Sequence, residues 1–388
     1  MTALYTDEVS QKKRAVSLDI ARGSMLFLII LSHIPLFLYT IEPGVLTKVA
    51  GSTPLDHFLN FLMEIMVDNR ARPLFAILFG YGLVMIYRKQ RERKGAEEAK
   101  RIVKRRCWYL ILFGAILAGV AGGQDILMTY GIAGLILVFT LKKNNKKIKR
   151  YVLSSTTICV VYIPLLWGGI ILGNQSYGLS TGLTGQETYL NTISEGLMAI
   201  PIIPLFTHIF FPIIPSVLMG IWLGNLNILI KPHDHIKRLK QLTIIFLVIS
   251  FVGAIPLVLI NDFWFPSLFT AGIAYGIHVL TGFAGGVGYA TLFGLLGVSI
   301  KHHGVIVKAI TAMGKRSLTF FVIHEILLVI LLSPIAFNLG AFLTVTTSVL
   351  FGIVMWAITL SVAYFMERRQ IEGPLEKYMR YLTYKKQV

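Results

Sequence analysis

Residues 17–40 read SLDIARGSMLFLIILSHIPLFLYT and decide the fold class of this chain. The stretch is apolar from Gly23 to Leu38, and a run of this length is typical of a membrane-spanning helix. Two ionisable residues accompany it, Arg22 and His33, eleven positions apart. At a rise of about 1.5 Å per residue they are separated by roughly 16 Å, or half the hydrocarbon layer. Because ionisable side chains are costly at membrane depth, the pair predicts a functional site.

The composition of the whole chain agrees with an integral membrane protein. Of its 388 residues, 55% are hydrophobic and 14% charged, whereas soluble domains carry about 25% charged residues. We therefore predict a single membrane domain, with a cytoplasmic leader at 1–16, a transmembrane bundle at 17–366 and a cytoplasmic tail at 367–388. The leader has no small-residue cleavage site before the first apolar run, so we expect it to be retained.

Ten apolar stretches are long enough to be read as spans. They cover residues 17–40, 72–88, 107–122, 126–141, 151–173, 200–226, 241–261, 267–298, 317–338 and 341–366. Lysine and arginine gather in alternate connections, whereas the others carry mostly acids, which predicts cytoplasmic and outer loops respectively. The sequence thus predicts an all-α, polytopic helix bundle of about ten transmembrane helices with both termini cytoplasmic.

Two segments depart from simple spans. Residues 54–71 are predicted to form a helix that lies at or re-enters the outer face before the second span. Four prolines in the sixth span predict a kinked or discontinuous helix there. They are Pro201, Pro204, Pro212 and Pro215.

The net charge of +18 is explained by this topology and by contact with anionic lipid, so no nucleic-acid partner is expected. Only two cysteines occur, Cys107 and Cys159, both in or beside apolar runs. This usage argues against a disulfide framework and against a metal site.

Near the inner face, polar residues form a predicted cationic opening toward the cytosol. Asp19 and Arg22 are three positions apart and able to pair, and Lys315 and Arg316 begin the ninth span at the same level. His324 and Glu325 lie two turns further in. Such a group would bind the phosphates of a ligand such as coenzyme A. The alternatives are that Lys315 and Arg316 are topological anchors and that Asp19 and Arg22 form a structural ion pair.

In the outer half, the sequence places a second polar group around His33. An imidazole can act as a general base or form an acyl-imidazole, and a carboxylate would fix its tautomer. We expect Asp125 or Asp19 to be that carboxylate. The remaining candidates are substrate-binding residues, namely Arg70, Arg72 and Tyr130.

Several motifs, taken in order, resemble a known family. LDIARG at 18–23 resembles the LDxxRG motif of the first helix in a superfamily of bacterial membrane acyltransferases. LFGYGL at 78–83, DILMTY at 125–130, MGIWLG at 219–224, GKRSLT at 314–319 and GPLEKYMRYLTY at 373–384 follow. This order resembles the YeiB family of multi-pass membrane proteins, a family of unknown function.

The resemblance implies an activity. Relatives of this superfamily take acyl groups from cytosolic acyl-CoA and deliver them to acceptors across the membrane, and Arg22 with His33 matches their arginine–ten–histidine pattern. This sequence departs from the family pattern at Leu117, where a histidine is expected, and at His324, where a glutamine is expected. The implied protein is an acyl-CoA-dependent acyltransferase, with acetyl-CoA as the expected donor.

In that reading His33, Asp125 and Asp19 would act in catalysis, and Arg22, Lys315, Arg316 and His324 would hold the donor. The acceptor would be an extracytoplasmic glycan, amine or lipid, and a homo-oligomer is possible. Two alternatives remain open: a transporter or exporter of an anionic small molecule or lipid, and a non-catalytic envelope protein. The absence of a recognisable internal repeat counts against the transporter.

Overall fold

The computed structural model describes residues 16–46, 48–122, 125–260, 262–300 and 304–384. The described residues form α-helices, short 3-10 helices and three isolated β-bridges, so the prediction of an all-α bundle is confirmed. Nearly all of the predicted leader, residues 123–124 between the third and fourth predicted spans, and the end of the predicted tail at 385–388 lie outside the described residues.

Seven helical segments of the described chain are long and apolar enough to cross a membrane. Their helices are α2 (Val16–His33) with η1 (Ile34–Phe37), α3 (Pro54–Met66) with α4 (Ala71–Lys94), α7 (Asn145–Asn174), α8 (Tyr189–Phe210), η3 (Pro232–His235) with α10 (Ile236–Leu259), α11 (Leu268–Ser299) and α14 (Val345–Arg368). Many apolar side chains of α7, α8, α10 and α14 face outward. Such surfaces fit contact with lipid rather than water.

Shorter or more polar helices complete the bundle. They are α5 (Ala96–Ala121), α6 (Leu127–Leu137) with η2 (Val138–Lys142), α9 (Ile213–Asn225), α12 (Val305–Lys315), α13 (Ser317–Leu332), η4 (Leu339–Ala341) and α15 (Pro374–Tyr384). Three segments, Leu127–Lys142, Ile213–Asn225 and Ser317–Leu332, are apolar but short. The chain is therefore a polytopic helical membrane protein whose spans are less uniform than ten equal helices.

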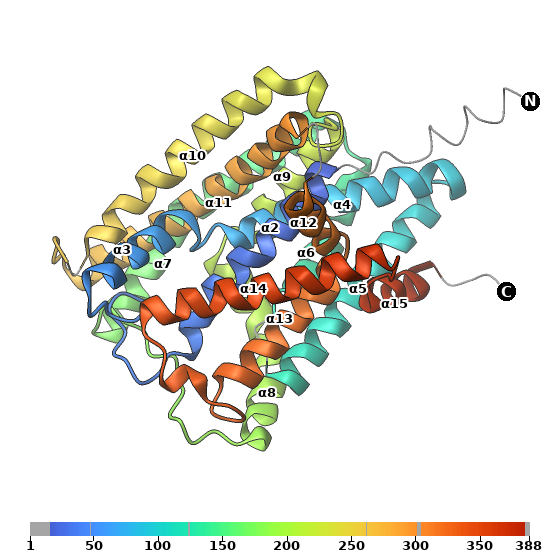
Figure 1. Ribbon diagram of the computed structural model, residues 1–388. Coiled ribbons are helices and arrows are strands. Elements are labelled where there is room, and N and C mark those ends of the chain that lie inside the picture. The colour runs from blue at the N-terminus through green and yellow to red at the C-terminus, as the bar shows by residue number, and fades with distance from the viewer. Residues whose placement is uncertain (1–15, 47, 123–124, 261, 301–303, 385–388) are drawn as a thin grey trace, which may run out of the picture.

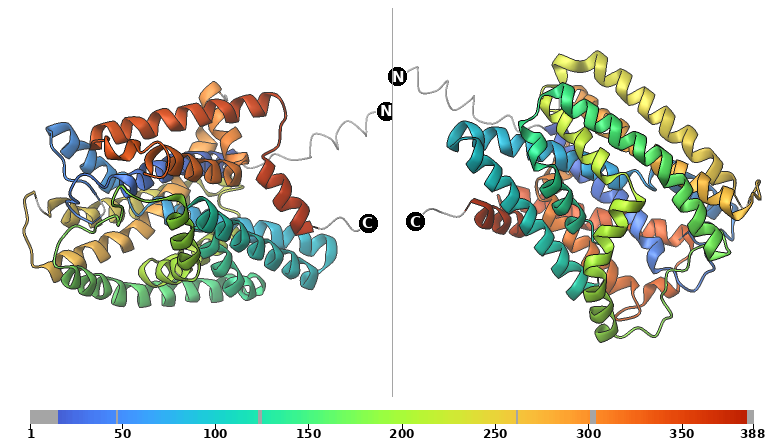
Figure 2. Two further views of the ribbon diagram at one scale, coloured as in Figure 1. Left: turned by 90° about the horizontal axis from the view of Figure 1, so that it is seen from below. Right: turned by 180° about the vertical axis from the view of Figure 1, so that it is seen from behind.

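Helix α2 runs through the middle of the bundle, in contact with α4, α11, α12, α13 and α14 (Figure 1). Glycines make this close packing possible. A side chain at Gly314 would lie 1.8 Å from the Asp19 carbonyl oxygen, and one at Gly23 would lie 2.2 Å from the Ile310 carbonyl oxygen. Seen from below in Figure 2, α14 and α7 lie on opposite sides of the bundle. The first helix is thus the central element that the others surround.

The connections gather at two ends, as the charge pattern predicts. At one end Ser17 donates to the Leu229 carbonyl, Arg88 bonds to Asn225, and Arg105 bonds to the Thr383 carbonyl. At the other end Thr346 bonds to Asp56 and Tyr39 to Asn338. The start of α2 and the end of α15 lie on the same side of the bundle (Figure 1). This agrees with termini on one side of the membrane.

The basic segment 88–106 is not the loop that we predicted. Helix α4 continues to Lys94 and α5 begins at Ala96, so the segment is a helical hairpin that projects past the apolar part of the bundle. The turn between them is Gly95, whose φ of 83° is a conformation that glycine adopts without strain. The predicted tail contains α15, which packs against α5 and α13.

Two spans are interrupted inside the bundle. The predicted sixth span begins earlier than expected, at Tyr189, and consists of α8 and α9 with a break at Phe211 and Pro212. Pro201 and Pro204 lie within α8 without ending it. The second interruption separates α3 from α4 at residues 67–70, where Asn69 has a φ of 57°. The predicted helix at 54–71 therefore exists, and it leads directly into the next span.

Candidate functional site

His33 meets a buried carboxylate inside the bundle. Its Nδ1 atom lies 2.7 Å from Oε1 of Glu325, and the side chains are 13% and 0% exposed. With the Nδ1 proton donated to Glu325, Nε2 is left as the basic nitrogen. The expectation that Asp125 or Asp19 would be the partner is wrong, because Glu325 occupies that place.

Asp19 is too distant from His33 to act on it. The two residues lie fourteen positions apart on α2, which is about 21 Å of helix. Asp19 instead forms an ion pair with Arg22, 3.5 Å between Oδ1 and Nη1, as their spacing predicts. Gly314 packs against the backbone of Asp19. The pair therefore marks the end of the bundle at which α2 begins.

Asp125 begins α6. Its carboxylate accepts hydrogen bonds from the backbone N–H groups of Leu127 and Met128, at 2.8 and 2.9 Å. A side chain at Gly114 would collide with this carboxylate, so the glycine on α5 makes room for it. Asp125 and Glu325 are close enough for their charges to interact. Asp125 therefore lies near the pair and has a structural role, because it accepts from the first backbone N–H groups of α6.

All four of the predicted donor-binding residues have protein partners, and that of Arg22 is Asp19. Arg316 is 5% exposed and bonds to Glu367, 2.7 Å between Nη1 and Oε2, and to the Ile371 carbonyl. Lys315 also pairs with Glu367. His324 is fully buried, with Nε2 2.9 Å from the Thr359 hydroxyl. The side chains of Arg22 and Lys315 keep 27% and 32% exposure.

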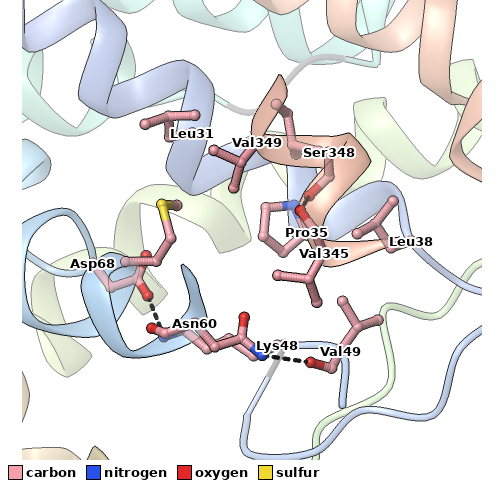
Figure 3. A pocket seen from close by; sticks show the side chains of 12 residues that line it. Leu31, Pro35, Leu38, Lys48, Val49, Asn60, Asp68, Val345, Ser348 and Val349 are labelled. Carbon is pink, nitrogen blue, oxygen red and sulfur yellow. Dashed lines mark hydrogen bonds and ion pairs between the residues drawn. The ribbon is translucent and has the colours of Figure 1, made fainter. Parts of the chain in front are cut away.

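A second ionic cluster lies toward the other end. The ammonium group of Lys48 is 3.1 Å from Glu64 Oε1 and 2.9 Å from Asp68 Oδ2. Beside it is a cavity of about 390 Å³, whose lining includes Leu31, Ile34, Pro35, Asn60 and Ser348. Figure 3 shows Lys48, Asn60 and Asp68 on one side of this cavity and apolar side chains of α2 and α14 on the other. The cavity is amphipathic, and three of its residues flank His33 in the sequence.

Arg70 holds the break between α3 and α4. It is fully buried and donates to the carbonyl groups of Glu64, Asp68 and Ser250 and to the Ser250 hydroxyl. His278 of α11 also contacts its guanidinium. Free carbonyl groups at a helix end need donors in an apolar interior. These contacts give Arg70 a structural role.

Arg72 and Tyr130 form a separate contact. The Tyr130 hydroxyl donates to the Arg72 carbonyl at 2.8 Å, and its ring stacks on Phe75 with centroids 4.9 Å apart. The Arg72 guanidinium lies 3.8 Å from the ring centre of Phe211, at the α8–α9 break. Thus the guanidinium of Arg72 lies at the break in the sixth span, and Tyr130 packs against the start of α4.

Sequence reasoning missed Glu325, Lys48 and His278 as members of the interior clusters. For Glu325 a signal was present, because a carboxylate inside an apolar span needs a partner. We grouped it with the inner cations by counting residues from the start of the ninth span. Among the described residues no group of three or more histidine, cysteine, aspartate or glutamate side chains is arranged to hold a metal ion.

Comparisons with known proteins agree with the predicted family. Residues 223–386 match the family model described as "Protein of unknown function (DUF418)", so the predicted resemblance is confirmed in this segment, which contains Glu325. A relative of the chain is "Uncharacterized protein YxaH" of Bacillus subtilis (strain 168), 27% identical over 145 residues. That match covers 35% of this chain and 35% of the length of YxaH.

Proposed function

We propose that this membrane protein is an acyltransferase that moves an acyl group from acyl-CoA to a sugar or amine on the other side of the bilayer. The observation that carries the proposal is the 2.7 Å contact between His33 and Glu325 in the bundle interior. A buried carboxylate that holds an imidazole by one nitrogen is the arrangement that general bases use, since it orients the ring and stabilises its charged form.

The proposed chemistry needs only these two side chains and the substrates. Nε2 of His33 takes the proton from the acceptor hydroxyl or amine as the acceptor attacks the thioester carbonyl. A C–O or C–N bond forms and the C–S bond breaks. The imidazolium then returns the proton to the thiolate leaving group. In the covalent alternative, His33 itself carries the acyl group between the two substrates.

The donor would enter at the end of the bundle where α2 begins. Arg22 and Lys315 are partly exposed there, and their charges would bind phosphate groups. Arg316 would stabilise this end of the bundle rather than bind the donor, because it donates to Glu367 and to the Ile371 carbonyl before α15. His324 lies deeper, between α13 and α14.

The acceptor would approach through the cavity at the opposite end. The cavity combines polar and apolar walls, as small-molecule sites do. Lys48, Asn60 and Asp68 supply polar groups for a sugar or amine, and Leu31 and Pro35 bring the cavity wall to the turn of α2 that carries His33.

A second candidate function is transport of an anionic small molecule or lipid. Two interrupted spans, α3–α4 and α8–α9, favour it, because transporters place their substrate sites at broken helices near the middle of the bilayer. Transport would move the ligand without covalent change.

The experiment that tests acyl transfer measures release of free coenzyme A thiol from acetyl-CoA by the protein in nanodiscs, with a panel of amine and amino-sugar acceptors. Mass spectrometry of the acceptor identifies the product. Wild type should release thiol in an acceptor-dependent manner, and His33→Gln should lose the activity. A matched control is His235→Gln, in the basic turn before α10. Folded wild type that acylates no acceptor and releases no thiol would favour transport instead.

A further inference from the structure

The two interrupted spans meet at one cavity. It has a volume of about 200 Å³ and is lined by both breaks and by α11. The residues are Asn69, Arg72 and Pro73 around the start of α4, Phe211, Pro212, Ile213 and Ser216 around the start of α9, and Val279 of α11. The first turns of α4 and α9 therefore face the same small space.

The start of each helix is electropositive. Helix α4 has 24 residues and α9 has 13, and neither N-cap residue, Arg70 or Pro212, caps its helix with a side-chain hydrogen bond. Pro73 and Pro215 have no N–H group, and the Ile213 N–H donates to the Phe211 carbonyl. The first-turn N–H groups that remain belong to Ala71 and Arg72 of α4 and to Ile214 of α9. Together with the helix dipoles, such groups favour an anion.

Arg72 supplies an independent indication of a ligand. Its Nη1 atom is buried and has no hydrogen-bond partner, and no hydrogen bond or ion pair joins its guanidinium to any side chain in the described part of the chain. The carboxylate of Asp68 is instead paired with Lys48, at 2.9 Å. One face of the guanidinium lies on the ring of Phe211. A cation inside an apolar bundle normally has a counter-ion.

We propose that this cavity binds an oxyanion, a single carboxylate or phosphate group, held by Arg72 and by the first turns of α4 and α9. The planar fork of an arginine suits such groups. The apolar walls formed by Pro73, Ile213 and Val279 accommodate a group attached to the anion.

The proposal does not depend on acyl transfer, because no hydrogen bond or ion pair connects Arg72 with His33 or Glu325 among the described residues. The oxyanion could belong to a soluble molecule or to a lipid headgroup. Both sources present the same chemistry to Arg72, so the experiment includes an arm for each.

The test uses the full-length protein in nanodiscs made only of phosphatidylcholine. In one arm inorganic phosphate or acetate is titrated at constant ionic strength, and in the other the nanodiscs also contain phosphatidic acid. The readout is the midpoint temperature of unfolding. We expect a saturable rise in one arm, and an apparent affinity at least about tenfold weaker in Arg72→Gln. Arg101→Gln, whose side chain is 76% exposed, removes the same charge away from the cavity and should bind as wild type does.

Hydrogen exchange on the wild type provides a second measurement if Arg72→Gln fails to fold. Bound anion should slow exchange in the first turns of α4 and α9. A response to phosphate or acetate identifies a soluble oxyanion, and a response only to phosphatidic acid identifies a headgroup. No response in either arm, equal binding by Arg72→Gln, or an absence of protection in both first turns would overturn the proposal.

Discussion

His33 on α2 and Glu325 on α13 are 292 positions apart in the chain, yet their side chains meet at 2.7 Å inside the bundle. The contact joins the first helix to the segment that matches a family model. Glu325 is fully buried, and its Oε2 atom has no hydrogen-bond partner in the described part of the chain. A buried carboxylate of this kind is retained where its charge serves a function or a specific partner.

The first prediction concerns Glu325→Gln. The amide keeps the shape of the side chain but removes its negative charge, so His33 loses the group that stabilises its protonated form. We expect the rate of acyl transfer to fall about 100-fold or more, with little change in the midpoint temperature of unfolding. Thiol release from acetyl-CoA measures the rate, and Glu195→Gln on α8 is the matched control. If Glu325→Gln kept the wild-type rate, the pair of His33 and Glu325 would have no role in catalysis.

The second prediction compares two neighbouring arginines. Arg70 donates to several oxygens at the α3–α4 break, whereas the guanidinium of Arg72 makes no such bonds in the described chain. Arg70→Gln leaves buried carbonyl groups unpaired and should destabilise the protein by about 3 kcal/mol or more. Arg72→Gln should cost less. Midpoint temperatures of unfolding in one detergent compare the two, and an equal or reversed order would contradict the structural role of Arg70.

Much of the fold follows from local sequence properties. Apolar runs and the distribution of lysine and arginine predict where the helices cross and which connections share an end, because both depend on transfer of side chains into lipid. The interruption at Phe211 and Pro212 was predicted in kind, since prolines end helices. It was not predicted in position, because Pro201 and Pro204 are tolerated within α8.

The site was less predictable, because it depends on packing between distant helices. The number of residues from each helix start gives only an approximate depth, so Glu325 was assigned to a different level from His33. The glycine contacts that bring α2 against α12, at Gly23 and Gly314, involve backbone atoms of residues nearly three hundred positions apart. No local pattern encodes which glycine faces which helix. Arg22 and Asp19, by contrast, are on one helix, and their pairing follows from spacing alone.

The third prediction tests this glycine packing. A methyl group at Gly314 would lie 1.8 Å from the Asp19 carbonyl oxygen, so Gly314→Ala must push α12 away from α2. We expect a clear fall in the midpoint temperature of unfolding, from a loss of about 2 kcal/mol or more. Gly169→Ala is the matched control, because that glycine lies in α7 with nothing within 4 Å of the added methyl. It should be neutral or stabilise by up to about 1 kcal/mol. Equal tolerance of both changes would show that the close contact at Gly314 is wrong.

The fourth prediction concerns the orientation of the bundle in the membrane. Both native cysteines are buried, so whole cells that express the wild type should show little labelling of the protein by a membrane-impermeant maleimide. Ser180 and Lys143 are exposed and lie in connections at opposite ends. With both termini cytoplasmic, Ser180→Cys should react in intact cells, whereas Lys143→Cys should react only after the membrane is permeabilised. The reverse labelling pattern would show that both termini lie outside the cell. The proposed entry sides of donor and acceptor would then be exchanged. Labelling of both positions in intact cells would show that the two ends are not separated by the bilayer.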